Sequence, residues 1–223
     1  MRIDRRWFLA IAVLLLPLFL LVVAKARGDR EETKFRWDII HIGAFSPKIT
    51  VFEGGFASAL ANDGSMITLT GKGTFQPGDP EEVTGGGTWQ TFSPPDAKGV
   101  RTSTGNGTYR VRRLVRFDPA PGFQGTNVID NTGNGTLNDN QAGLAYFRIT
   151  YSDGSKGVLV VSCRLNGGPA VVNGVRTPPA SPATVFEGIT ASKGFVDYWN
   201  RLDAVAGVDA NRSLIHILPE EED

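Results

Sequence analysis

The chain has 223 residues, of which 41% are hydrophobic and 21% are charged, a composition that suits one folded domain and excludes a disordered chain. Its 23 Lys and Arg residues balance its 23 Asp and Glu residues, which argues against a nucleic-acid-binding protein. Glycine is enriched, at 27 residues or about 12% against a usual ~7%, without the period of collagen or the serine of a flexible linker.

An uncharged run of 18 residues, from Trp7 to Ala24, follows three arginines near the start of the chain. A basic segment followed by an apolar one is typical of an export signal, and residues 24–26 (AKA) have the spacing of small residues that signal peptidase cleaves. In a helix the run is about 27 Å long, enough to cross a thin bilayer uncleaved. We therefore predict that residues 1–26 are a signal peptide or an N-terminal membrane anchor.

Residues 5–9 (RRWFL) resemble the twin-arginine export signal of bacteria, although Asp4 stands where that signal usually has Ser or Thr. General secretion and twin-arginine export both stay open. Either route predicts an exported protein, membrane-anchored or secreted/periplasmic. Removal of residues 1–26 would take four of the 23 basic and one of the 23 acidic residues, and would leave 19 and 22, a net charge of −3.

The rest of the chain predicts a charged stalk at 27–36, a single all-β domain at 37–218 and an acidic tail at 219–223. Apolar residues in the domain alternate or form short runs bounded by Gly, Pro, Asn and Asp, as in an antiparallel β-barrel or β-sandwich of about 8–10 strands. Loops are predicted at 76–83, 93–99, 118–143 and 166–183. Outside the hairpins described next, strands are predicted at 35–42, 49–53, 84–92, 107–117, 184–186 and 213–218.

Two hairpins are marked by Asp-Gly turns, at 62–65 (NDGS) and 152–155 (SDGS), each between two apolar segments. Glycines also precede aromatic residues in a repeated pattern, at 71–75 (GKGTF), 85–89 (GGGTW) and 105–109 (GNGTY), with a weaker copy at 133–137. Glycine at such positions indicates bulges, bends or close approach of two backbones in a curled sheet. One short helix is predicted near the C-terminus, because Phe195, Trp199 and Leu202 have helical spacing.

The standard catalytic motifs are missing, and the sequence predicts no catalytic residue, no cofactor and no nucleic-acid partner. His41 and His216 each lie in an apolar strand, so we interpret both as structural, with a two-histidine site across strands as the alternative. Cys163 lies in an apolar run and is interpreted as a buried thiol. Acids at 81–82 and on predicted elements (Asp38, Glu53, Glu187, Asp197) are interpreted as surface groups.

Residues 130–141 (DNTGNGTLNDNQ) partly match a calcium-binding loop. The weak Ca²⁺ candidates are Asp130, Thr132, Asn134 and Asn138, but position twelve is Gln141 instead of the bidentate glutamate. An Asn- and Gly-rich turn is therefore the default interpretation. The basic run 110–116 (RVRRLVR) places Arg110 and Arg112 on one strand face and Arg113 on the other if no bulge intervenes.

Two functions remain open from the sequence. The first is a non-catalytic exported domain that binds a small molecule, a glycan or another envelope protein, with Trp37, Trp89 and Trp199 as an aromatic platform. If residues 7–24 are not cleaved, the membrane is a further partner. The second is an enzyme, because residues 65–117 resemble the glycine-punctuated barrels of the allene oxide cyclase and dirigent families. That resemblance implies an apolar cavity that guides a small apolar substrate.

Overall fold

The computed structural model describes residues 33–44, 49–120, 128–133, 140–163, 170–172, 175–177, 187–202 and 211–219. Within these ranges the chain is all-β, as the sequence predicts, and contains no helix long and apolar enough to cross a bilayer. The apolar run 7–24 and the predicted strand 184–186 lie outside the described residues.

Fifteen strands form one sheet, and β12 (Ala170–Val172) and β13 (Val175–Thr177) form a separate hairpin. The longest path of paired strands runs β15-β14-β11-β10-β8-β7-β5-β1-β2-β9, with the remaining strands as branches. The fifteen strands are β1 (Phe35–Ala44), β2 (Ile49–Glu53), β3 (Ala57–Leu60), β4 (Met66–Leu69), β5 (Lys72–Gln76), β6 (Asp79–Val83), β7 (Gly86–Phe92), β8 (Ser103–Ala120), β9 (Val128–Asp130), β10 (Ala142–Tyr151), β11 (Lys156–Cys163), β14 (Gly188–Lys193), β15 (Val196–Tyr198), β16 (Asn200–Arg201) and β17 (Ser213–Ile217).

The architecture differs from the prediction in three respects. The described strands are more numerous than 8–10, because segments expected to be loops contain short strands; the predicted loop 76–83, for example, contains β6. The sheet is not closed, so it is a curled sheet and not a complete barrel. The pair β2–β9 is parallel, whereas the other described strand pairs are antiparallel.

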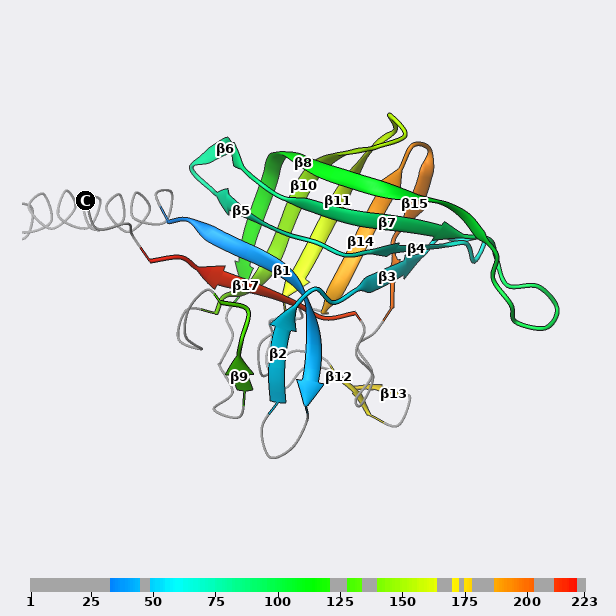
Figure 1. Cartoon of the computed structure of the whole chain (residues 1–223), viewed down its shortest axis with the longest axis horizontal. Helices are drawn as coiled ribbons and strands as arrows, with labels where there is room; N and C mark the ends of the chain where they lie inside the picture. The colour runs from blue at the N-terminus through cyan, green and yellow to red at the C-terminus, as the bar shows by residue number, and fades with distance from the viewer. Residues whose placement is uncertain are drawn as a thin grey trace, which may run out of the picture.

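The curl of the sheet depends on the long strand β8. Its first half pairs with β7 and its second half pairs with β10, so one continuous strand passes from one layer to the other. Figure 1 shows β7, β4, β5 and β1 in front of β10, β11 and β14, with β8 turning between them. The hydrophobic core lies between these two layers.

Aromatic side chains fill much of this core. The Phe75 ring stacks on Phe35 at 5.2 Å between centroids and meets the edge of Phe147 at 5.6 Å. Trp37 lies 5.5 Å from Phe147 and is fully buried. Phe35 and Trp37 alternate along β1 with Arg36, so one face of the strand enters the core, as the period of two predicts.

The glycine repeats lie where strands approach each other closely. A Cβ atom on Gly73 of β5 would lie 2.2 Å from the Thr84 carbonyl oxygen, and one on Gly87 of β7 would lie 2.1 Å from that of Thr70. On β8, a Cβ atom on Gly107 would lie 2.9 Å from Trp89 Nε1, so glycine there makes room for the indole. The structure confirms that these glycines mark close approach in a curled sheet.

Both Asp-Gly hairpins are confirmed. The turn 62–65 joins β3 to β4 and the turn 152–155 joins β10 to β11. Gly64 and Gly154 have φ angles of 83° and 85°, a conformation that other residues adopt at a cost. Asp63 and Asp153 each accept a hydrogen bond from the backbone N–H two residues later, which fixes the turn.

The predicted helix around Phe195, Trp199 and Leu202 is wrong. Gly194 has a φ of 60° and, with Phe195, forms the turn between β14 and β15. Lys193 pairs with Val196 across this turn, and β16 then pairs with β3. Pairing with neighbouring strands therefore overrides a helical spacing of three apolar residues.

Candidate functional site

Two bulges in β8 turn its arginines toward one face. Opposite β10, Phe147 pairs with Leu114 but Tyr146 pairs with Arg116, so one extra residue lies between them on β8. A second register shift lies between Arg148 and its neighbour Ile149. Each bulge lets two successive residues face outward, and the core-facing positions of β8 then recur every three residues.

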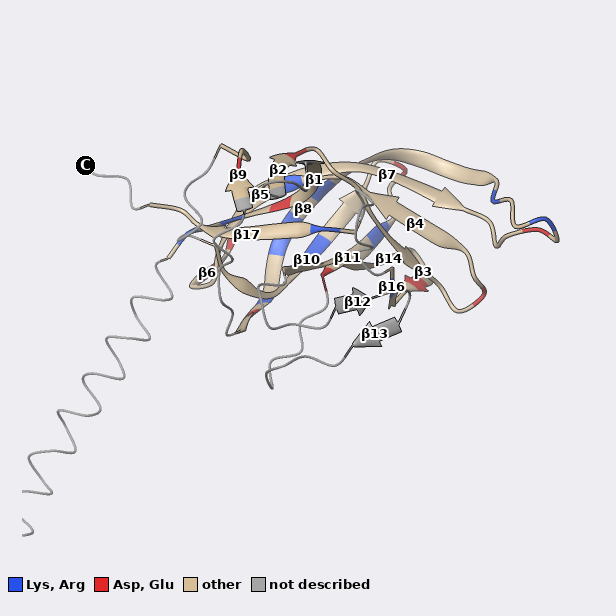
Figure 2. Cartoon of the chain, turned by 90° about the horizontal axis from the view of Figure 1, so that it is seen from below, with Lys and Arg blue, Asp and Glu red and all other residues tan. Residues whose placement is uncertain are grey.

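The expected division of the arginines between two faces is therefore wrong, because it required a strand without bulges. Val111 and Leu114 enter the core, and all the arginines of the run are exposed. Figure 2 shows Lys and Arg positions on the adjacent strands β8 and β10. We define the basic face as the exposed cationic residues of β8, β10 and β11, which are Arg110, Arg112, Arg113, Arg116, Arg148 and Lys156.

Cross-strand register places these cations close together on the sheet. Thr150 of β10 pairs with Arg110 on one side and Lys156 on the other, so the three form one row. Arg148 pairs with Arg113 and begins the next row. Neighbouring strands are about 4.8 Å apart and like charges opposite each other are unfavourable, so nearby anions would stabilise this grouping.

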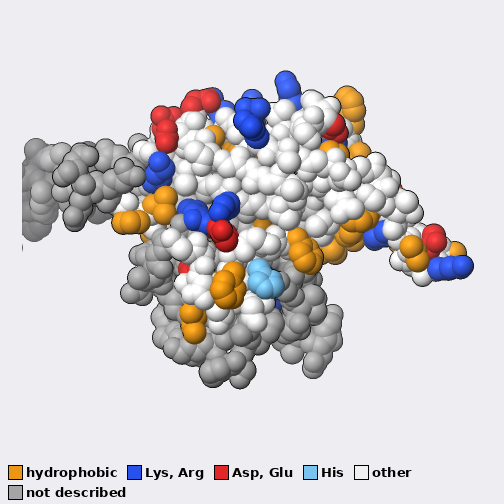
Figure 3. Space-filling view, viewed as in Figure 1, with side chains coloured by type: hydrophobic (Ala, Val, Ile, Leu, Met, Phe, Trp, Pro, Cys, Tyr) orange, Lys and Arg blue, Asp and Glu red, His pale blue; other side chains and the backbone are white. Residues whose placement is uncertain are grey.

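Among the described residues, acids of the chain compensate only two of the six cations. Arg113 forms an ion pair with Glu81 of β6, and Arg116 forms one with Asp118. The other four members, Arg110, Arg112, Arg148 and Lys156, form no ion pair within the described residues. Figure 3 shows Lys and Arg side chains along the upper outline of the molecule, beside a group of acids.

The basic face is a local excess on an acidic chain. Acids border it on both sides: Asp79, Glu81 and Glu82 of β6 with Asp118 on one side, and the exposed Asp197 of β15 on the other. Four of the six cations have no ion-pair partner among the described residues, while residues 27–223 together carry a net charge of −3. A face with this excess attracts anions within about a Debye length of 8–10 Å.

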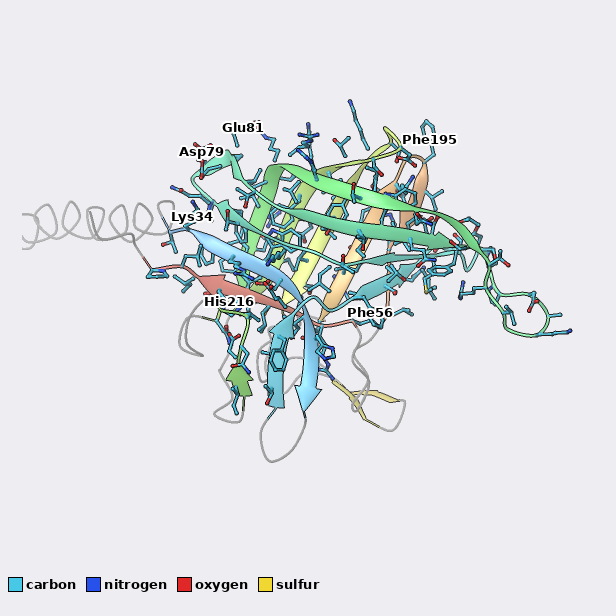
Figure 4. All side chains as sticks on the ribbon, viewed as in Figure 1. Lys34, Phe56, Asp79, Glu81, Phe195 and His216 are labelled. Atoms are coloured by element: carbon cyan, nitrogen blue, oxygen red, sulfur yellow. The ribbon has the colours of Figure 1, made fainter. Side chains whose placement is uncertain are left out.

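A second group of charged residues is buried and lies elsewhere in the fold. Asp38 of β1 accepts hydrogen bonds from the Arg36 guanidinium at 2.8 and 2.7 Å. Burial raises the pKa of Asp38, and the hydrogen bonds and positive charge of Arg36 oppose that rise. His216 of β17 lies beside this pair, and its Nδ1 is 3.5 Å from Asp130 Oδ2. Figure 4 shows His216 at the junction of β17 with the strands below it.

The buried charged residues Asp38, His216 and Asp130 connect β1, β17 and β9. Asp38 and His216 are 0% exposed, and the Asp130 side chain is 3% exposed, so a solute has no direct access to them. His216 Nε2 also lies 3.3 Å from Thr132 Oγ1, which follows β9. The contacts hold the end of β9 against β1 and β17, a structural role.

Part of the calcium candidate lies in the same place. Asp130 Oδ1 accepts hydrogen bonds from the backbone N–H and the hydroxyl of Thr132, at 2.9 and 2.8 Å. The Asp130 carboxylate therefore fixes the backbone that follows β9. Asn134 and Asn138 lie outside the described residues. Over the part of the chain that is described, no group of three or more His, Cys, Asp and Glu residues could hold a metal ion.

The remaining sequence candidates do not come together as a site. His41 of β1 is exposed and pairs with Phe52 of β2. His216 pairs with Arg36, which lies five residues before His41 on β1, so the two histidines are about 16 Å apart along the strand. Cys163 is buried, and burial raises its pKa to about 12, as expected of a structural thiol.

The predicted aromatic platform is mostly part of the core. Trp37 and Trp89 are 0% and 5% exposed, and only Trp199 is half exposed. Lys193 lies over the Trp89 ring at 4.2 Å from its centroid and forms an ion pair with Asp153. This lysine therefore covers the edge of the core, and the basic face is the stronger candidate for ligand binding.

No known protein family, curated protein or solved structure matches the chain. The evidence for the candidate site is therefore the arrangement of its residues in the structure. Sequence reasoning noticed the arginine run but missed Arg148 and Lys156, which reach the same face only through strand pairing.

Proposed function

We propose that the chain is an exported β-domain, secreted or held at the membrane by residues 7–24, that binds an anionic partner through the basic face. The observation that carries this proposal is a set of four exposed cations on adjacent strands that have no ion-pair partner among the described residues: Arg110, Arg112, Arg148 and Lys156. A rigid sheet holds them in fixed relative positions, so an anion meets a preorganised surface. Binding, without chemistry, is the role that this surface supports best.

The alternative, a barrel enzyme of the cyclase or dirigent kind, has less support. Such an enzyme needs an apolar cavity, whereas the described interior packs Phe35, Phe75 and Phe147 against one another in an open sheet. The exposed Phe52, Phe56 and Trp199 are more typical of a binding protein.

The test is an equilibrium titration of the full chain, in a zwitterionic detergent, with fluorescent inorganic polyphosphate. The double variant Arg148→Gln/Lys156→Gln should bind at least about tenfold more weakly than the wild type. The matched control is Lys72→Gln/Lys98→Gln, which removes two exposed cations outside the basic face and should change the affinity less than about twofold. Equal losses in both variants, or no binding by the wild type, would contradict the proposal.

A further inference from the structure

We propose that the anionic partner is a phospholipid bilayer, on which the basic face docks while Phe195 enters the headgroup layer. This inference rests on the proposed function, because it names the partner of the same face. Two features outside the basic face favour a bilayer: the exposed position of Phe195 and the place where the chain enters the domain.

Phe195 is an apolar side chain held out into solvent next to the basic face. It occupies the two-residue turn between β14 and β15 and is 108% exposed. The backbone N–H of Gly194 donates a 3.0 Å hydrogen bond to the carbonyl oxygen of Lys156, which fixes the turn beside a member of the face. In Figure 4, Phe195 lies at the upper edge of the molecule, away from the core. An exposed aromatic beside cations is typical of proteins that lie at a membrane interface.

The chain enters the domain at the opposite border of the face. Lys34, just before β1, forms an ion pair with Glu82 of β6 at 3.3 Å. The adjacent Glu81 forms the ion pair with Arg113 of the basic face. Figure 4 shows Glu81 and Phe195 toward opposite ends of the upper edge of the molecule, and Lys34 below Glu81 at the end where the chain enters the domain. The basic face therefore lies between the entry point and Phe195.

This entry point limits how far the domain can move from a membrane. If residues 7–24 remain in the bilayer, residues 25–34 are the whole tether, and ten residues span at most about 33–36 Å. A short tether gives the domain a high effective concentration at the surface, so even weak contacts are occupied. The domain then meets the bilayer with the side of the fold that carries the excess positive charge.

A bilayer fits the surface better than a soluble polyanion does. Anionic headgroups would compensate the unpaired cations, and each cation near such a surface raises the partition coefficient about fivefold. A soluble polyanion would use the same cations but would leave Phe195 in water. A bilayer accommodates both the charges and the exposed ring.

The test is footprinting of the full chain in lipid nanodiscs of two compositions, phosphatidylcholine alone and phosphatidylcholine with phosphatidylglycerol. Lys156 should be acetylated at least about fivefold more slowly in the anionic discs. Lys98, an exposed lysine of the β7–β8 loop, is the internal control and should react equally in both. Equal reactivity of Lys156 in the two compositions would overturn the inference.

The variant Phe195→Ser separates the ring from the charges. It should raise the reactivity of Lys156 in anionic discs part of the way toward its value in phosphatidylcholine discs, because the cations still attract the surface, and it should leave the affinity for soluble polyphosphate unchanged. Protection of Lys156 that this substitution leaves undiminished would overturn the role of Phe195. Polyphosphate binding without protection in discs would refute the bilayer and keep the proposed function, whereas loss of both would refute both.

Discussion

Substitution of the repeated glycines by alanine tests the curled sheet on which the basic face is built. Gly73 and Gly85 of the repeats, with Gly99 of the β7–β8 loop for comparison, separate the cost of a positive φ angle from the cost of a clash between the new Cβ atom and a neighbouring backbone. Gly73 has no positive φ, but its Cβ would lie 2.2 Å from the Thr84 carbonyl oxygen. Gly99 has a φ of +79° and nothing within 4 Å of its Cβ position. Gly85 combines a φ of +106° with a Cβ 2.2 Å from the Lys72 carbonyl oxygen.

The magnitudes follow from the geometry. An L-residue in the positive-φ region costs about 1–2 kcal/mol, so Gly99→Ala should lower the free energy of unfolding by about 1 kcal/mol. The obstacle for Gly73→Ala is backbone, which cannot rotate away, and the strands must separate by about 1 Å, at a cost of about 3 kcal/mol. Gly85→Ala carries both penalties, and we expect about 4 kcal/mol.

The assay is thermal unfolding of the full chain in a zwitterionic detergent, followed by near-ultraviolet circular dichroism of the buried tryptophans. For a domain of this size, 1 kcal/mol lowers the melting temperature by about 2–4 °C, so Gly73→Ala should lose about 6–12 °C. The order of loss should be Gly85, Gly73, Gly99. A loss for Gly73→Ala no larger than that for Gly99→Ala would refute close backbone approach at β5.

Three further predictions concern buried or paired groups. Cys163, whose pKa burial raises to about 12, should not react with a thiol reagent at pH 8 until the protein unfolds, and a stoichiometric reaction of the native chain would contradict its burial. The hydrogen bond from Lys193 lowers the pKa of Asp153 from 3.8 to about 2, so this contact stabilises the fold above pH 4 and is lost as the pH falls through about 2. Because Asp153 is exposed, Asp153→Asn should lower the free energy of unfolding by less than about 1 kcal/mol at pH 7 in urea titrations, and the difference should vanish near pH 2. His216→Leu should cost about 2–4 kcal/mol by the same titration, because it leaves the buried carboxylate of Asp130 without that partner.

Local chemistry predicted a large part of the fold. Asp-Gly turns placed both hairpins, since a tight turn needs a residue with positive φ, and Gly64 and Gly154 supply it. The alternation of Phe35, Arg36 and Trp37 predicted the start of β1, where one face of the strand enters the core. Periodicity failed at residues 195–202, where three apolar residues have helical spacing but the chain pairs with β3 and β14.

The candidate site was harder to predict because it depends on pairing between distant strands. A bulge adds one residue to a strand without changing its composition, so nothing in 110–116 indicates that Arg113 faces outward with Arg112. Arg148 joins the face only through the register of β10, and the contact of His216 with Asp130 joins residues that are far apart in the chain. These features follow from tertiary structure.

The central claim is that the basic face binds an anion by charge, and the salt dependence of polyphosphate binding tests it most directly. The logarithm of the wild-type affinity should fall linearly with the logarithm of the salt concentration. Arg110→Gln/Arg112→Gln should reduce that slope by about two, one for each cation removed. Identical slopes for the wild type and this variant would contradict the claim.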